Sequence, residues 1–399
     1  MDIVNRFINY AKIDTQSDPN SQTIPSTMKQ KDLARLLLKE LKDMGLESFM
    51  DEYGYVYAKI NKTKEGHTPI GFIAHMDTSP DAPGANVNPR IIKNYQGETI
   101  KLNEALSMSP STFPDLNYVI GDDIIVTDGH TLLGADNKAG VAIIMDFAQT
   151  LLKNKPPHGD IYIGFTPDEE IGRGADKFDL DFFKAKFAYT VDGSHVGVIN
   201  FENFNASSAD VKFIGKSIHP GSAKNKLINA QHLAFEFHSM LPPFLNPAYT
   251  DNYDGFNHLS DMKGEVEKAH LHYIIRNHSY ELFLKQQQTF HEIKDYMNKK
   301  YGYEAVLVDI KESYLNMYEV LKDDFQSVDI AKQATLNLGI PYVEHPIRGG
   351  TDGARLSFMG LPCPNLGTGG FNFHGRFEFL SINQMKQSVL ILLEIASLV

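Results

Sequence analysis

Short apolar runs alternate with stretches of helical periodicity over the first half of the chain. The runs at 70–75, 161–166 and 187–191 are almost continuously apolar, as expected for short strands that are covered on both faces. Residues 29–44 place their leucines on one stripe of a helix, and residues 139–152 form a strongly apolar helical stretch. Helices that alternate with buried strands predict an α/β layer architecture with a mostly parallel sheet.

The pattern changes in the middle of the chain. Residues 209–214 and 265–275 alternate apolar and polar positions, which is typical of strands with one solvent-exposed face. Residues 230–241 have helical spacing, and Ser279 is suited to be the N-cap of a helix that runs to about residue 300. A further strand is predicted at 305–310. This order of elements predicts a small α+β domain inserted into the α/β domain.

The length of the chain supports this division. At 399 residues the protein exceeds what a single hydrophobic core usually supports. We therefore predict one α/β domain over residues 1–204 and 313–399, and a second domain inserted over residues 205–312.

Composition narrows the range of partners. The formal net charge is −12 and basic residues form no long run, which argues against nucleic acid or an anionic membrane surface as a partner. Cys363 is the only cysteine, which excludes an internal disulfide and fits a reducing compartment. The amino terminus lacks the continuous apolar core of a signal peptide, and no apolar stretch reaches the ~18 residues of a membrane span. The expectation is a soluble cytoplasmic protein.

Candidate metal ligands follow several of the apolar segments. In an open parallel sheet the carboxyl ends of the strands converge on one crevice, where ligands bind. Imidazole and carboxylate groups brought together there suit two divalent metals, which can activate water and clamp a scissile carbonyl. The pattern therefore indicates a hydrolase. The candidate ligands are His75, Asp136, Glu170, Asp192 and His374.

His75 and Asp77 lie on the same side of an extended segment, because side chains alternate along a strand. A metal-binding His usually donates its other ring N–H to a carboxylate, which fixes its tautomer, and Asp77 is a candidate for that role. The alternative is a surface loop whose His and Asp share no task.

For three further carboxylates both a functional and a structural interpretation are possible. Asp136 precedes a helix, where a carboxylate can serve as a cap, but its apolar surroundings favour a shared ligand that bridges two metals. Glu169 and Glu170 are adjacent and project in different directions. Glu169 is the candidate general base and Glu170 the candidate ligand; the alternative is a solvated acidic turn.

Other residues are candidates for contact with the substrate. His219, in the predicted inserted domain, is placed to donate a hydrogen bond to a developing oxyanion, or is a turn residue before Pro220. Arg276 and Arg348 could hold a substrate carboxylate, or serve as structural arginines. Asn225, which ends the stretch that begins near His219, is included as a substrate-binding candidate.

Other reaction types lack their sequence signatures. The chain contains no Gly-x-Ser-x-Gly elbow, no phosphate-binding loop and no His-Glu-x-x-His zinc helix. Cys363 is flanked by two prolines and is interpreted as a small apolar filler rather than a nucleophile.

Motifs along nearly the whole chain resemble those of the M20 metallopeptidases. They include His75–Asp81, Leu132–Asp136, Gly164–Gly174, His219–Asn225 and Arg348–Gly353. The resemblance implies a catalytic domain that binds two zinc ions and an inserted domain that acts as a lid and a dimerisation surface.

The resemblance also implies a division of the ligands. Asp136 would bridge both metals, His75 and Asp192 would complete one site, and Glu170 and His374 would complete the other.

The remaining implied features concern groups around the metals. Asp77 would orient His75, and Glu169 would activate the bridging water. The resemblance further implies a cis peptide between Asp136 and Asn137, a lid that carries His219, and a homodimer formed through the lid.

The resemblance thus implies a metal-dependent aminopeptidase that releases the N-terminal residue of short peptides, chiefly tripeptides. Zinc is the expected metal, with manganese or cobalt as alternatives because carboxylate-rich sites accept all three. The rival functions are another M20 activity (dipeptidase, carboxypeptidase or N-acyl amino acid deacylase) and a catalytically silent binding protein that keeps the metals as a scaffold.

Overall fold

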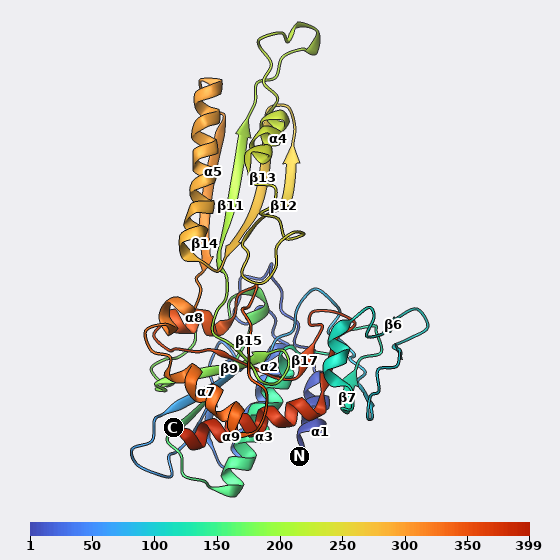
Figure 1. The fold of residues 1–399 in the computed structure, drawn as a ribbon, viewed down its shortest axis with the longest axis vertical. Helices are drawn as coiled ribbons and strands as arrows, with labels where there is room; N and C mark the ends of the chain where they lie inside the picture. The colour runs from blue at the N-terminus through green and yellow to red at the C-terminus, as the bar shows by residue number, and fades with distance from the viewer. The chain divides into compact units, whose positions relative to one another are not determined.

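The structure is a computed structural model that describes all 399 residues. The chain folds into two compact units, and each is described separately (Figure 1). The larger unit comprises Met1–Phe201, Val320–His345 and Thr351–Val399, and the smaller unit comprises Glu202–Glu319 and Pro346–Gly350.

An eight-stranded sheet forms the centre of the larger unit. Its strand order is β1-β2-β8-β3-β9-β16-β10-β15, and the central strands β8, β3, β9 and β16 run parallel to one another. The strands are β1 (Glu47–Met50), β2 (Val56–Ile60), β3 (Ile70–His75), β8 (Ile161–Thr166), β9 (Phe187–Gly193), β10 (Val198–Asn200), β15 (Val343–Glu344) and β16 (Asn365–Gly367). This arrangement confirms the predicted α/β layer.

Both faces of this sheet are covered, which explains why its central strands are apolar at every position. Phe72 of β3 contacts Phe147 of a helix on one face, with ring centroids 4.9 Å apart. The next residue, Ile73, belongs to a buried cluster with Leu356 on the other face. The helices of the larger unit are α1 (Ile3–Ala11), α2 (Gln30–Asp43), α3 (Ala135–Asn154), α7 (Gln326–Asn337), α8 (Asp352–Phe358) and α9 (Ile382–Leu398); α6 (Tyr318–Leu321) crosses the boundary between the units.

Two small sheets in the larger unit have no counterpart in the sequence prediction. One has the order β17-β18-β7-β4, and the other pairs β5 with β6. Their strands are two or three residues long, which is too short for a periodicity to show. They are β4 (Arg90–Ile92), β5 (Ile100–Lys101), β6 (Ser107–Met108), β7 (Ile124–Val126), β17 (Gly370–Phe371) and β18 (Phe379–Ser381), accompanied by the 3₁₀ helices η1 (Pro114–Val119) and η2 (Glu169–Ile171).

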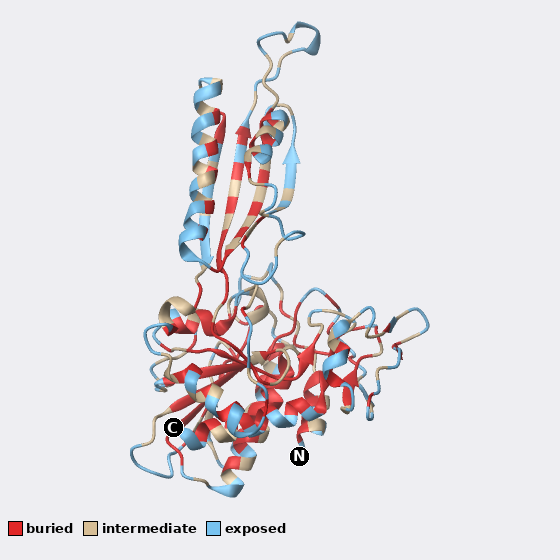
Figure 2. Cartoon of the chain, viewed as in Figure 1, coloured by how far each residue is buried: buried red, intermediate tan, exposed pale blue.

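The smaller unit is a four-stranded antiparallel sheet with two helices packed on one face. The strand order is β12-β13-β11-β14, and α4 and α5 share a buried apolar cluster with alternate residues of the sheet. Figure 2 shows this alternation as buried and less buried bands along the strands. The elements are β11 (Asn205–Ile214), η3 (Pro220–Ser222), α4 (Ala230–Met240), β12 (Phe256–Gly264), β13 (Lys268–Asn277), α5 (Tyr280–Tyr301) and β14 (Val306–Tyr314).

Ser279 is the N-cap of α5, as predicted, and its side chain accepts a hydrogen bond from the backbone N–H of Leu282. The predicted strand at 265–275 is in part wrong, because a turn occupies its first residues and β13 begins at Lys268. β12 was not predicted, since much of it is exposed and it lacks a strong apolar alternation.

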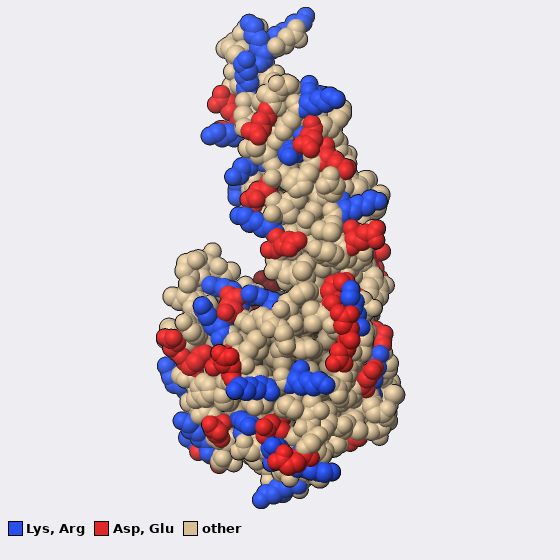
Figure 3. Space-filling model, turned by 90° about the vertical axis from the view of Figure 1, so that its left-hand side faces the viewer, with Lys and Arg blue, Asp and Glu red and all other residues tan.

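No helix of the structure has both the length and the apolar character that crossing a membrane requires. On the face drawn in Figure 3, basic and acidic side chains are interspersed rather than gathered by sign.

Candidate metal centre

Three adjacent strands deliver candidate ligands to one edge of the large sheet. His75 ends β3, Asp192 is the second-last residue of β9, and Glu169 and Glu170 begin η2 just after β8. Because β3 pairs in parallel with both β8 and β9, the carboxyl ends of the three strands meet at the same edge, as predicted.

Asp136 joins this group from the start of α3, which packs on β3 and β9. The peptide bond between Asp136 and Asn137 is cis, which confirms the expectation drawn from the M20 resemblance. Both residues have non-helical backbone angles, so the regular helix begins after them. The Asp136 carboxylate therefore projects from an irregular turn rather than from a helical surface.

The two oxygens of Asp136 face two different imidazoles. Oδ1 lies 2.9 Å from Nε2 of His75, and Oδ2 lies 3.3 Å from Nε2 of His374. Asp192 Oδ1 is 3.3 Å from the same nitrogen of His75, and Glu170 Oε2 is 2.9 Å from Nε2 of His374. Two groups able to hold a metal result, His75–Asp136–Asp192 and Asp136–Glu170–His374, with Asp136 common to both.

The residues fit a pair of divalent metals on chemical grounds. Each group offers one imidazole nitrogen and two carboxylate oxygens, a donor set that zinc accepts. Oε1 of Glu170 is buried and has no hydrogen-bond partner, an arrangement that costs free energy unless a ligand reaches that oxygen. The site thus has an orphaned acceptor where a cation would bind.

Burial of these acids dominates the electrostatics of the site. Burial raises the pKa of Glu170 to about 8 and that of Asp192 to about 6, and it raises the pKa of Glu169 well above its usual range. Hydrogen bonds to Asp136 and Glu170 raise the pKa of His374 to about 11. Without a cation, burial therefore disfavours the ionised forms of Glu169, Glu170 and Asp192.

Asp136 differs from its neighbours. Burial would raise its pKa, but hydrogen bonds from His374 and His75 outweigh that effect and lower the pKa of Asp136 below its usual range. It is therefore the carboxylate best kept ionised between the two imidazoles.

Asp77 contacts both His75 and the turn that carries the two glutamates. Its Oδ1 lies 3.3 Å from Nδ1 of His75, and the carbonyl oxygen of Asp77 lies 3.1 Å from the same nitrogen. The carboxylate also accepts the backbone N–H groups of Glu169 and Glu170, at 2.9 and 3.1 Å. This fully buried side chain thereby connects β3 to the turn that carries both glutamates.

The sequence prediction missed Glu378, which holds the loop in front of Asp136. Its side chain, about 1% exposed, accepts the backbone N–H groups of Leu133, Gly134 and Asp136 at 2.6, 2.8 and 3.0 Å. The loop contributes only backbone N–H groups to these hydrogen bonds, so no residue type in the loop indicates the contact with Glu378. The one available signal was the position of Glu378, four residues after His374.

Two further buried acids support the turn after β8. Asp168 accepts hydrogen bonds from the backbone and hydroxyl of Ser26 and from Gln30. Asp352 accepts from the hydroxyl of Thr166, at 2.8 Å. Both acids lie inside motifs that carry the family resemblance, but their contacts with distant residues could not be derived from spacing.

The catalytic candidate His219 and the three substrate-binding candidates all lie in the smaller unit. His219 is exposed, and its Nδ1 accepts the backbone N–H of Gly221 at 3.2 Å. Asn225 is exposed with a left-handed backbone (φ 59°). The side chain of Arg276 donates to the carbonyls of Ser207 and Ile275 and lies over the ring of Tyr314.

The side chain of Arg348 forms its contacts with other residues of the smaller unit. Its guanidinium donates to the carbonyls of Asn252 and Asp254 and to Thr250, and it lies over the rings of Phe204 and Phe256. These contacts favour the structural alternative for Arg348 that the sequence left open.

The fold and the donor set together define a metal-dependent hydrolase with a mixed α/β core and ligand groups for two metals. Residues 134–397 match the pattern of Peptidase family M20/M25/M40. A protein named Peptidase T from Clostridium perfringens is 50% identical over 393 residues, which cover 98% of this chain and 97% of that protein. The chain belongs to this family of peptidases.

Solved structures show the same fold. The aminopeptidase PepT of Bacillus cereus superposes with a TM-score of 0.80 at 23% identity, covering 99% of this chain and 97% of that one. A tripeptidase of Staphylococcus aureus superposes with a TM-score of 0.79 at 22% identity, with the same coverage.

Replacing Glu378 with Gln is expected to weaken metal binding about 10- to 100-fold, the usual effect of losing a residue that orients a ligand. The amide NH₂ of Gln would face backbone N–H groups and leave at least one of them without an acceptor. Metal affinity is measured by competition with a chromophoric chelator. Glu65→Gln, at an exposed position, is the control, and equal affinities in the two variants would contradict this role of Glu378.

Proposed function

We propose that this protein is a two-metal aminopeptidase that releases the N-terminal residue of short peptides, chiefly tripeptides. The observation that carries the proposal is the division of the Asp136 carboxylate between two ligand groups, one on each of its oxygens. The relatives named Peptidase T and the likeness to an aminopeptidase and a tripeptidase support the choice of substrate.

In the proposed site, His75 and Asp192 would hold one metal, Glu170 and His374 would hold the other, and Asp136 would contribute to both. Zinc is the proposed metal, since one imidazole and two carboxylates per ion match its preferences, and manganese or cobalt would fit the same donors. When bound, a pair of such ions lowers the pKa of water and polarises the scissile carbonyl.

Glu169 is the proposed general base. It stands beside the ligands without belonging to either group, since its Oε2 is 3.9 Å from Nε2 of His75. Asp77 fixes its backbone through the Glu169 N–H. The Glu169 carboxylate takes a proton from the attacking water and delivers it to the nitrogen of the leaving amine. Its raised pKa, caused by burial, suits a group that must both accept and release a proton.

His219 is the proposed donor to the oxyanion of the tetrahedral intermediate. Because its Nδ1 accepts the N–H of Gly221, the proton of the neutral imidazole resides on Nε2. That N–H is the group available for donation. Asn225 and Arg276 are proposed to contact the substrate, and Arg348 to support the surrounding loop or the substrate carboxylate.

The oligomeric state and the cellular compartment of the protein can be proposed as well. We propose a homodimer formed through the smaller unit, whose helices carry exposed apolar side chains such as Phe235 (58% exposed) and Tyr296 (56% exposed). Large apolar side chains that remain exposed in one unit can be covered by a second copy of the chain. A cytoplasmic location fits the single cysteine, which is buried and unpaired.

Glu169→Gln tests the assignment of the base. We expect kcat to fall by a factor of about 10² to 10⁴, the usual range for the loss of a general base, with metal content unchanged. Glu170→Gln is the matched comparison and should lose metal from one of the two sites. Turnover of Glu169→Gln close to that of the unmodified enzyme would contradict the assignment, as would loss of metal in that variant.

The substrate proposal is tested by release of free amino acid from an unblocked tripeptide, its dipeptide and tetrapeptide counterparts and its N-acetylated form. We expect cleavage mainly of the free tripeptide, and none after treatment with a chelator. A preference for the acetylated form would indicate a deacylase, and a preference for the dipeptide would indicate a dipeptidase. Release of the C-terminal residue would indicate a carboxypeptidase. No turnover with metal bound would favour the silent scaffold.

A further inference from the structure

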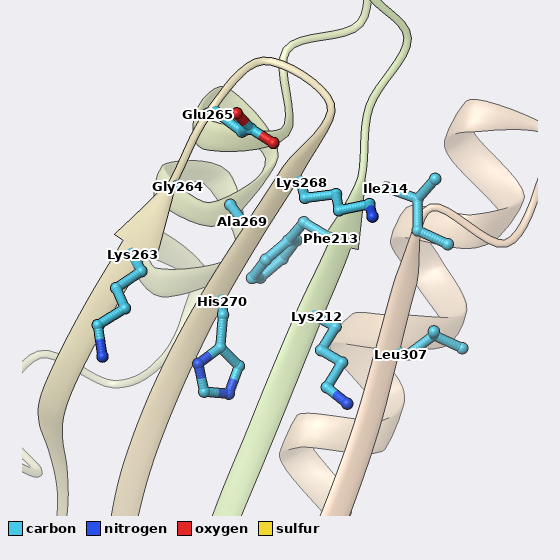
Figure 4. Close-up of a pocket in the computed structure, with 10 residues that line it drawn as sticks. All are labelled: Lys212, Phe213, Ile214, Lys263, Gly264, Glu265, Lys268, Ala269, His270 and Leu307. Atoms are coloured by element: carbon cyan, nitrogen blue, oxygen red, sulfur yellow. The ribbon is translucent and has the colours of Figure 1, made fainter.

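A hollow of about 660 Å³ on the sheet of the smaller unit is not suited to a cation. Three lysines, Lys212, Lys263 and Lys268, line it together with one glutamate, Glu265, and Figure 4 shows these side chains. Repulsion from three ammonium groups disfavours a further metal ion there. The groups that support the metal centre are instead found in the larger unit, beside the ligands themselves.

The two imidazoles of the metal centre have different surroundings. His75 ends the buried strand β3, and its side chain is 2% exposed. His374 lies in the turn between β17 and β18, where its backbone is left-handed (φ 63°) and its side chain is 43% exposed. The orientation of the His374 imidazole therefore depends on contacts of its side chain rather than on a strand.

Each imidazole has an aspartate beside its second ring nitrogen. Nε2 of both rings faces Asp136, whereas Nδ1 of His75 faces Asp77. Nδ1 of His374 lies 3.5 Å from Oδ2 of Asp81. A neutral imidazole that binds a metal through Nε2 carries its proton on Nδ1, and a carboxylate beside Nδ1 favours that tautomer and fixes the ring. Asp81 thus has the same place beside His374 that Asp77 has beside His75.

A glutamine from the N-terminal segment supports the loop that carries Asp81. Nε2 of Gln16 donates hydrogen bonds to the carbonyl oxygens of Ser79 and Ala82, at 3.0 and 2.8 Å. The backbone N–H of Asp81 donates to Oγ of Ser79 at 3.2 Å. These hydrogen bonds hold the loop on both sides of Asp81, although the side chain of Asp81 is 69% exposed.

We propose that Asp81 is a positioning residue for His374, whose imidazole it orients for metal binding, and that Gln16 acts through Asp81 by fixing its loop. This inference rests on the two-metal site proposed above. Residues that orient a metal ligand usually change metal affinity by a factor of about 10 to 100. The pair of Asp81 and His374 is open to solvent, which screens its interaction, so the effect of Asp81 is expected at the lower end of this range.

Asp81→Asn tests the role of the charge, because the variant keeps the shape of the side chain. When a chromophoric chelator withdraws Zn²⁺ from the fully loaded enzyme, we expect two equivalents from the unmodified protein. In Asp81→Asn one of the two should be bound about tenfold more weakly, while the affinity for the other is unchanged. Asp43→Asn is the control, since the carboxylate of Asp43 is 62% exposed and pairs with Lys39 at 2.7 Å on α2.

The outcomes separate this inference from the proposal on which it rests. If Asp81→Asn holds both equivalents as tightly as the unmodified enzyme, the role of Asp81 is overturned and the two-metal site stands. If the unmodified enzyme holds fewer than two equivalents, both are overturned.

Two further readouts distinguish orientation of a ligand from contact with the substrate. Asp81→Glu, which keeps the charge, should retain more of the affinity for the weaker equivalent than Asp81→Asn. With Co²⁺ in place of Zn²⁺, the visible absorption of the more weakly held ion should change in Asp81→Asn and not in Asp43→Asn, because the spectrum follows the ligand geometry. A KM for the free tripeptide that remains raised in Asp81→Asn at saturating metal would place Asp81 on the ammonium group of the substrate and overturn the positioning role.

Gln16→Leu tests the support of the loop. Loss of the two donated hydrogen bonds should weaken the same equivalent of Zn²⁺ when Asp81 is present, and should have a much smaller effect in the Asp81→Asn background. Residues that act through one another give such non-additive changes. Additive losses in the double variant would overturn the role of Gln16.

Discussion

The position of the Asp136 carboxylate is the constraint on which the site depends. Its two oxygens serve two ligand groups, so a small rotation or shift of this one residue would disturb both. The surrounding structure limits such movement, because Glu378 accepts the backbone N–H of Asp136 and those of Leu133 and Gly134 in the loop before it. Glu378 itself comes from the segment that follows His374. One buried glutamate thus links the bridging carboxylate to the part of the chain that supplies the imidazole of the second group.

A comparable connection exists on the other side of the site. Asp77 receives two N–H groups from the turn that carries Glu169 and Glu170, and it also lies against His75. The ligands at the ends of β3 and β8 are therefore coupled by hydrogen bonds as well as by strand pairing. Burial of so many acids would be unfavourable without a compensating cation, and this burial is what raises the pKa values of Glu170 and Asp192.

The sequence predicted those parts of the fold that depend on local pattern. β3 and β8 have the predicted bounds, β9 begins at the predicted residue, and the N-cap of α5 was anticipated, because buried strands and helix caps have strong local signals. The short strands around 90–126 and 370–381 were missed, since each is too short for a period. Glu378 was missed for another reason: it acts on backbone N–H groups of a distant loop, and such contacts arise only when the tertiary structure forms. The acids and imidazoles that the structure gathers into two groups were predicted to lie together, because their residue types are themselves the signal.

The central claim, that Asp136 bridges two metals, is tested most directly by a crystal structure of the metal-loaded enzyme with anomalous diffraction recorded at the absorption edge of the metal. We predict two anomalous peaks ~3.5–4 Å apart, the spacing usual for two-metal sites, with one oxygen of Asp136 coordinated to each. A single ion at this site, or two ions of which only one contacts Asp136, would contradict the account.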